Sequence, residues 1–249
     1  MPFSPEHPPK LVVFDLDQTL IACDSSQLWI DYLYDEGIVT DPRFKEENDR
    51  MVAEYHTGTL DIAAYLRAVT PAVYGIEPER LNVLLNDFAE RRIRPHFYRE
   101  GLERIERAKA LGIPVQIISA TCTYIVKPIA ERLGVPGDNV IGIDMVTDDE
   151  GRITNEIDGI PSFREGKVER VQEVLARYGL KPEDMLFFTD SRNDLPLALY
   201  AGATEVVDPD PVLLEKAKEM GWPVHGLRRL EHHRRTSGRG CCAQIFQRP

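Results

Sequence analysis

The chain has 249 residues, of which 43% are hydrophobic and 29% are charged. This composition argues against a disordered protein, and the length suits one large domain with a smaller domain inserted. Acidic residues outnumber basic ones by 41 to 30, giving a net charge of −11, which argues against general nucleic-acid binding because phosphate backbones need a basic surface. A small anionic substrate stays compatible with this charge if a local positive site offsets it.

The termini and cysteines carry no targeting or metal signal. No segment approaches the roughly 20 apolar residues of a membrane span, and the first ten residues lack the features of a secretion signal. We therefore expect a cytoplasmic protein without membrane association. The cysteines have neither disulfide nor zinc spacing, and we interpret Cys23 and Cys122 as small buried side chains. Residues 228–249 hold six arginines and one acid, and we expect a basic, flexible tail.

Short apolar segments alternate with amphipathic helices along most of the chain. Four such segments predict strands buried on both faces, at residues 11–14, 115–118, 185–189 and 205–207. Helical patterns begin near Thr123 and Lys167 and end at Gly134 and Gly179. This alternation predicts an α/β fold, in which helices cover both faces of a parallel sheet.

The strand pattern disappears between residues 24 and 94. Helical spacing replaces it, with apolar side chains at 28–33, at 60–69 and at 81–88. We predict a helical domain at residues 24–94, inserted into a core formed by residues 1–23 and 95–227. In residues 143–157, apolar and polar side chains alternate on both sides of an acidic, turn-rich centre, and this pattern predicts a β-hairpin.

Two acidic clusters follow predicted strands. Asp15 and Asp17 come directly after the first strand, and Asp190 and Asp194 follow the third. Such close acids repel each other unless a cation lies nearby. The alternative interpretation is a pair of solvated loop acids for the first cluster, and a helix cap and a turn for the second. Because ligands bind beyond the carboxyl ends of parallel strands, the two clusters together predict a Mg²⁺ site with room for a phosphate.

Ser119 and Lys167 are candidates for binding the anion. Ser119 ends the second predicted strand and offers a hydroxyl and a following backbone N–H, although an ordinary turn serine is the alternative. A serine nucleophile has no support, because no G-x-S-x-G segment surrounds Ser119. Lys167 begins a helix, where the macrodipole disfavours a cation. We therefore expect an acid or anion beside Lys167, with a solvated lysine as the alternative.

Four segments of the chain resemble the four motifs of the haloacid dehalogenase superfamily, in the same order. These segments are DLDQT with Asp15 and Asp17, ISAT with Ser119, EGK with Lys167, and DSRNDLP with Asp190 and Asp194. The resemblance covers most of residues 11–227 and is closest to the phosphoserine phosphatase-like branch, subfamily IB. It implies a Rossmann-like core with a small helical cap. Gln18 departs from the glycine or other small residue that many relatives have there.

The resemblance implies a Mg²⁺-dependent phosphomonoester hydrolase that forms an aspartyl-phosphate. Asp15 would be the nucleophile, and Asp17 would protonate the leaving oxygen and later deprotonate the attacking water. Mg²⁺ would bind the carboxylates of Asp15 and Asp190 and the backbone carbonyl of Asp17. Asp194 would be a further ligand or a neighbour of the ligands.

The resemblance also suggests how the substrate is held. Ser119, Lys167 and Asn193 would bind the phosphoryl oxygens. Asp24 resembles an acid that binds the substrate amino group in phosphoserine phosphatases, and Arg67 resembles an arginine that binds its carboxylate. A helix cap and a solvated helix charge are the alternatives for these two. If Asp24 acts and Arg67 does not, histidinol phosphate fits better than phosphoserine.

Other functional classes are compatible with parts of this pattern. A phosphotransferase would use the same aspartyl-phosphate chemistry with another acceptor, and it stays open as an alternative. A dehalogenase needs neither Asp17 nor Mg²⁺. A phosphorylated receiver-type module is about half this length and has no use for a cap. We therefore expect a small phosphomonoester as the partner molecule.

Overall fold

The computed structural model describes residues 7–226 and has the expected α/β fold. Within these residues, one six-stranded sheet runs in the order β3-β2-β1-β6-β7-β8, and every neighbouring pair is parallel. Its strands are β1 (Leu11–Phe14), β2 (Val115–Cys122), β3 (Val140–Ile143), β6 (Met185–Thr189), β7 (Ala203–Val207) and β8 (Val224–His225). Because all strands are parallel, their carboxyl ends gather along one edge of the sheet.

Three details of the predicted strands were wrong. β7 begins at Ala203, two residues before the predicted start. β2 continues beyond Ser119 to Cys122, which pairs with Ile143 of β3 after a shift in register. Ser119 and Ala120 are poor strand formers, so only the tertiary pairing reveals the extension. Ile143 belongs to the main sheet, and the expected hairpin is shorter, with β4 (Met145–Thr147) antiparallel to β5 (Ile153–Ile157).

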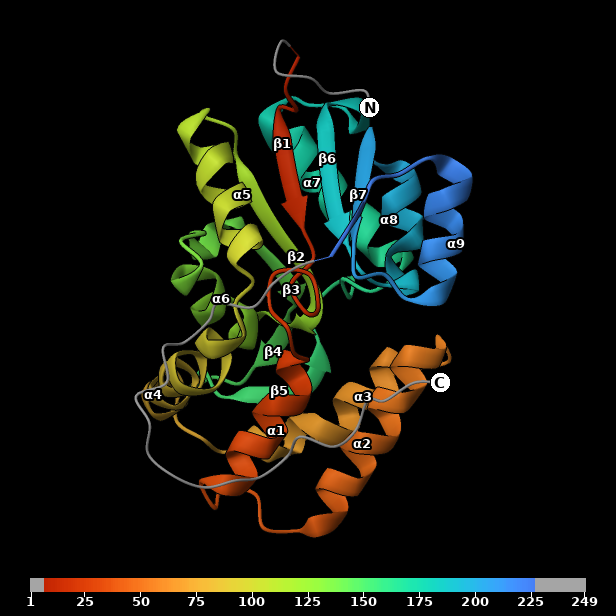
Figure 1. The fold of residues 1–249 in the computed structure, drawn as a ribbon. Helices are drawn as coiled ribbons and strands as arrows, with labels where there is room; N and C mark the ends of the chain where they lie inside the picture. The colour runs from red at the N-terminus through yellow and green to blue at the C-terminus, as the bar shows by residue number, and fades with distance from the viewer. Residues whose placement is uncertain (1–6, 227–249) are drawn as a thin grey trace, which may run out of the picture.

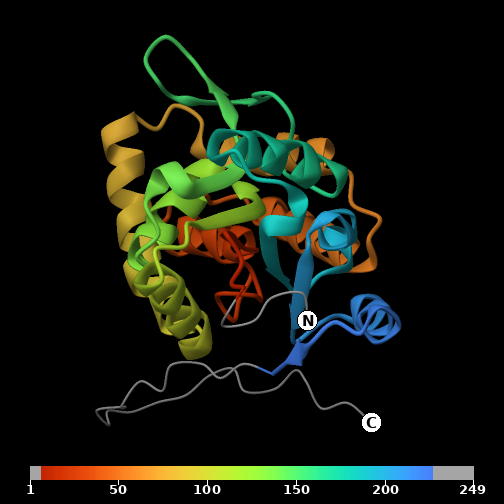
Figure 2. The same cartoon turned by 90° about the horizontal axis from the view of Figure 1, so that it is seen from above.

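The core helices cover both faces of the sheet (Figures 1 and 2). They are α5 (Arg99–Ala110), α6 (Thr123–Arg132), α7 (Glu165–Tyr178), α8 (Leu195–Tyr200) and α9 (Pro211–Met220). Val12 and Phe14 pack in one hydrophobic cluster with α5, whereas Leu11 and Val13 pack in another with α7 and α8. Successive β1 side chains point to opposite faces, which explains why this strand is continuously apolar.

Helices fill the segment between β1 and α5. They are α1 (Ser25–Asp35), α2 (Pro42–Thr57), α3 (Ile62–Val69) and α4 (Pro78–Phe88), followed by short helical segments Thr70–Val73, Ala89–Ile93 and Arg94–His96. In Figure 1, α1, α2 and α3 lie beyond the ends to which the β1, β6 and β7 arrows point. The helical insert is therefore placed over the edge of the sheet where ligands bind.

The two ends of the insert are joined where they meet the core. Ala22 N donates to His96 O at 2.8 Å, and Tyr98 N donates to Leu20 O at 2.9 Å. The division at residues 24 and 94 stays a prediction. β5 contacts α3 and the segment Thr70–Val73, so the hairpin also packs against the insert.

Three further expectations concern burial and the chain ends. Cys23 and Cys122 are buried and are not joined by a disulfide, as expected. No helix of residues 7–226 is long and apolar enough to cross a membrane. The predicted tail at 228–249 lies outside the described residues.

Candidate active site

The acidic clusters meet because β1 lies between β2 and β6 in the sheet. Asp15 extends the β1 ladder, with its backbone N–H donating to Phe188 O of β6 at 2.9 Å. Asp190 directly follows β6, and Ser119 lies within β2. Residues far apart in the sequence are thereby brought to one edge of the sheet, facing the insert (Figure 1).

Lys167 lies between two carboxylates at this edge. Its Nζ is 2.8 Å from Asp15 Oδ1 and 2.6 Å from Asp194 Oδ1, and its side chain is fully buried. Thr189 Oγ1 donates to the other oxygen of Asp194 at 2.8 Å. The structure thus explains why a lysine stands in the first turn of α7, where the helix dipole alone disfavours it.

The site concentrates more negative than positive charge. Burial raises the pKa of Asp15 to about 7; Lys167 opposes this rise, whereas Asp194 and Asp17 add to it. Burial and the charges of Asp15 and Asp194 also raise the pKa of Asp190 well above its ordinary value. For Lys167, burial alone would lower the pKa, but the charges of Asp15 and Asp194 raise it. A divalent cation would relieve the repulsion among these carboxylates.

The donor set at this edge fits Mg²⁺, which prefers oxygen ligands. Asp190 accepts a hydrogen bond from Thr19 Oγ1 at 3.2 Å. Across residues 7–226, no three His, Cys, Asp or Glu side chains form a cluster that could hold an ion by themselves. The expected ligand set, with two carboxylates and one backbone carbonyl, stays a prediction. Asp194 is bonded to Lys167 and Thr189, and its expected place as a ligand or as a neighbour of the ligands stays a prediction.

Asp17 is held as a hydrogen-bonded acid on the side facing the insert. Its Oδ1 accepts from the backbone N–H of Ser25 at 2.7 Å, and its Oδ2 accepts from Thr121 Oγ1 at 2.9 Å. Burial and the charge of Asp24 raise the pKa of Asp17 to about 7, while the bonds from Ser25 and Thr121 lower it. A carboxyl group with such a pKa can both give and take a proton near neutral pH. No local sequence signal marks Thr121 as a site residue.

Ser119 is buried beside Asp17 in a different local setting from the one expected. Its hydroxyl accepts from the backbone N–H of Thr121 at 3.1 Å, and its carbonyl accepts from Ser162 Oγ at 2.6 Å. The strand continues past Ser119, and α6 begins at Thr123, where the helical pattern predicted its start. Gln18 has a φ of 57°, a left-handed conformation that favours glycine.

Asn193 is buried, but its amide is already bonded to other parts of the protein. Its Nδ2 donates to the backbone carbonyl of Tyr55 on α2 at 3.1 Å, and its Oδ1 accepts from Arg164 Nε at 3.4 Å. The structure therefore links Asn193 to the insert, and its expected contact with a phosphoryl oxygen stays a prediction.

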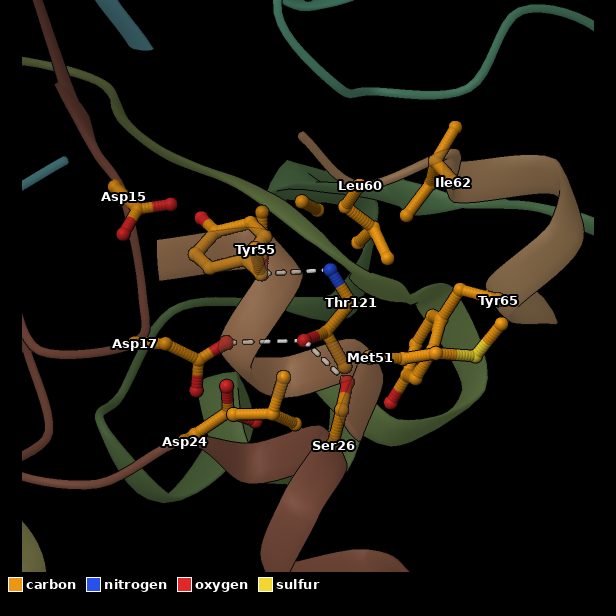
Figure 3. A pocket seen from close by; sticks show the side chains of 13 residues that line it. Asp15, Asp17, Asp24, Ser26, Met51, Tyr55, Leu60, Ile62, Tyr65 and Thr121 are labelled. Atoms are coloured by element: carbon orange, nitrogen blue, oxygen red, sulfur yellow. Dashed lines mark hydrogen bonds between the residues drawn. The ribbon is translucent and has the colours of Figure 1, made fainter. Parts of the chain in front are cut away.

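A cavity of about 470 Å³, including its open mouth, lies between the acidic edge and the insert (Figure 3). Asp24 lines it and also caps α1, accepting from Gln27 N at 2.8 Å. The cap interpretation is thereby confirmed, and the contact with a substrate amino group stays a prediction. The lining residues are Asp15, Asp17, Asp24, Ser26, Met51, Val52, Tyr55, Leu60, Ile62, Tyr65, Ser119, Ala120 and Thr121. The lining residues of α2 and α3 carry no local sequence signal of a site role.

Arg67 does not reach this cavity. Tyr65 lines the cavity from α3, and Arg67 follows two residues later, about 200° further around the helix. Arg67 is accordingly exposed. The structure brings together all the other predicted site residues at the acidic edge or in the cavity beside it.

A model of the haloacid dehalogenase-like hydrolases matches residues 12–199. The chain belongs to this family. A histidinol-phosphatase of Neisseria meningitidis serogroup C is 33% identical over 218 residues, which cover 86% of this chain and 97% of that protein. A solved structure from Bordetella pertussis Tohama I, described as a protein with unknown function, is 33% identical with a TM-score of 0.78 and covers 86% of this chain and 96% of that one.

A structure of phosphoserine phosphatase as a phospho-aspartyl intermediate analogue has the same fold. It is 22% identical, with a TM-score of 0.64, and the match covers 89% of this chain and 94% of that one. The predicted α/β class, the haloacid dehalogenase family and the enzyme class, a phosphatase of this family, are thereby confirmed.

Proposed function

We propose that the protein is a Mg²⁺-dependent phosphomonoesterase acting on a small amino-bearing ester, with histidinol phosphate as the first candidate. The cavity lining carries the proposal: it includes the carboxylate of Asp24 and, within the described residues, no arginine or lysine. A substrate ammonium group has an acidic partner there, whereas the carboxylate of phosphoserine has no basic one. The Neisseria relative is named a histidinol-phosphatase, which supports the same choice.

The walls of the cavity also suit a substrate with a ring. Leu60 and Ile62 are apolar, and Tyr55 and Tyr65 add aromatic faces on the same side (Figure 3). An imidazole ring can pack between such side chains while its ester phosphate faces Asp15.

Asp15 and Asp17 divide the chemistry between them. A carboxylate oxygen of Asp15 attacks phosphorus in line and forms an aspartyl-phosphate, while the ester oxygen leaves with a proton from Asp17. Asp17 then takes a proton from the water that attacks phosphorus. Inorganic phosphate is released, and the carboxylate of Asp15 is regenerated. Lys167, already 2.8 Å from Asp15, supplies N–H donors and positive charge to the phosphoryl oxygens.

The carboxylates of Asp15 and Asp190 and the backbone carbonyl of Asp17 would hold Mg²⁺. When bound, it supplies positive charge that stabilises the phosphoryl oxygens. The insert would act as a cap that keeps bulk water from the reacting groups. Its position over the sheet edge (Figure 1) supports this role.

Phosphate release from a substrate panel tests the proposal. The panel holds histidinol phosphate, phosphoserine, a nucleoside monophosphate, a sugar phosphate and an aryl phosphate, each with Mg²⁺ and with EDTA. We expect Mg²⁺-dependent release with the highest kcat/KM for histidinol phosphate. A preference for phosphoserine would refute the substrate assignment, and release that needs an added alcohol acceptor would identify a phosphotransferase.

A further inference from the structure

Tyr55 is the side chain of α2 that lies nearest the reacting carboxylates. It lines the cavity, and Figure 3 shows its hydroxyl directed toward Asp15. Burial and the charges of Asp194, Asp15 and Asp190 raise its pKa well above 10, while a hydrogen bond with Ser191 opposes this rise. The phenol is therefore neutral at physiological pH and keeps an O–H group that can be donated to an anion.

The end of α2 that carries Tyr55 is bound to the core through backbone carbonyls. Asn193 Nδ2 donates to Tyr55 O at 3.1 Å, and Arg164 Nη2 donates to Gly58 O. Gly58 ends the helix at a φ of 73°, and a Cβ atom there would lie 3.3 Å from Arg192 Cδ. The end of the insert helix thus lies directly against the core.

The core residues that hold α2 belong to the segments that carry the catalytic groups. Asn193 stands between Asp190 and Asp194, and Arg164 directly precedes α7 with Lys167. Arg164 has a φ of 51° and a ψ of −119°, which is unusual for a residue other than glycine. Such strained conformations persist where surrounding contacts impose them. Here those contacts are with Gly58 O and Asn193 Oδ1.

We propose that Tyr55 is a catalytic residue supplied by the insert, and that its hydroxyl donates a hydrogen bond to the phosphoryl group transferred to Asp15. Asn193 and Arg164 are positioning residues, because they hold the end of α2 where this bond can form. This inference rests on the proposed phosphatase function. It gives Asn193 a role through Tyr55 in place of direct phosphate binding.

Tyr55→Phe tests the catalytic role. Because the lost hydrogen bond is to the phosphoryl group, kcat/KM should fall about 10- to 100-fold for histidinol phosphate and for an aryl phosphate alike. Inhibition by inorganic phosphate should weaken as well. The matched control is Tyr32→Phe, which removes a buried hydroxyl bonded to Asp87 Oδ2 at 2.8 Å, away from the cavity. Unchanged kinetics in Tyr55→Phe, or a loss confined to histidinol phosphate, would overturn the proposal.

A double-mutant cycle tests the positioning role. If Asn193 acts through Tyr55, Asn193→Ala combined with Tyr55→Phe should lose no more activity than the more damaged single variant. If the fold-losses in activity of the two single variants multiply in the double variant, Asn193 acts on the phosphate independently of Tyr55, and its role as a positioning residue is refuted. Should Asn193→Ala fail to fold, as judged by thermal unfolding, Arg164→Ala replaces it in the same cycle and is judged by the same criterion.

Failure of this inference is distinguishable from failure of the proposed function. If the unmodified enzyme releases no phosphate from any ester, the proposed function fails. If it is active, while Asp15→Asn is inactive and Tyr55→Phe is fully active, only the role of Tyr55 is refuted.

Discussion

Replacing Lys167 by methionine removes the charge that pairs with two buried carboxylates and keeps most of the side-chain volume. The Nζ lies 2.8 Å from Asp15 and 2.6 Å from Asp194, and the lysine is fully buried. Removing one partner of a buried ion pair costs about 3 to 5 kcal/mol because the other charge stays unpaired. At roughly 2 to 4 °C per kcal/mol for a protein of this size, the unfolding midpoint should fall by about 6 to 20 °C.

Thermal unfolding followed by circular dichroism in EDTA measures this loss. The matched control is Lys109→Met, which breaks an ion pair with Glu106 at 2.9 Å whose side chains are 39% and 70% exposed. Exposed pairs contribute about 1 kcal/mol or less, so the control should move the midpoint by at most roughly 4 °C. If Lys167→Met is no less stable than Lys109→Met, the argument from burial is refuted.

Three other predictions concern the site. Asp15→Asn should abolish turnover while the circular dichroism spectrum stays unchanged, because the nucleophile is lost at nearly constant volume. Asp24→Asn should raise KM for histidinol phosphate but not for an aryl phosphate, whereas Arg67→Ala should change neither, because only Asp24 lines the cavity. In EDTA, the free energy of unfolding from urea titration should fall as pH rises from near 3.8 toward about 7. The pKa values of Asp15 and Asp17 are raised to about 7 by burial, so the folded chain keeps protons that the unfolded chain has lost.

Each of these outcomes can be contradicted. Normal turnover by Asp15→Asn would exclude the aspartyl-phosphate mechanism. Equal KM changes for both esters in Asp24→Asn would mean that Asp24 acts only as the α1 cap. A slope of stability against pH that persists unchanged in Asp17→Asn would show that other groups cause it.

Much of the site could be predicted because its residues stand next to strand ends. Asp15, Asp17 and Asp190 directly follow buried apolar segments, and the rules of parallel sheets bring such positions to one edge. Lys167 could be predicted from its unfavourable place at a helix start. In contrast, Tyr55 and Thr121 act through contacts with residues distant in the sequence, and no local pattern marks them.

Hydrophobic periodicity in the sequence also failed to predict some helix and strand boundaries, because these depend on contacts with distant residues. α2 is rich in charged residues and shows little apolar spacing, and the end of β2 is defined by its pairing with Ile143. Arg67 illustrates the converse error: its position in the sequence resembles a substrate-binding arginine, but the rotation of α3 directs it to solvent.

The sequence by itself determined the α/β class, the helical insert and the acidic groups of the site, because alternating apolar segments and charged strand ends are local signals. Only the tertiary structure decided which insert residues face the reacting groups, that Asp24 lines the cavity and Arg67 does not, and that Asn193 binds the end of α2. These facts depend on how two parts of the chain pack against each other. Packing between distant segments is set by the shape and burial of many side chains together, which no single motif encodes.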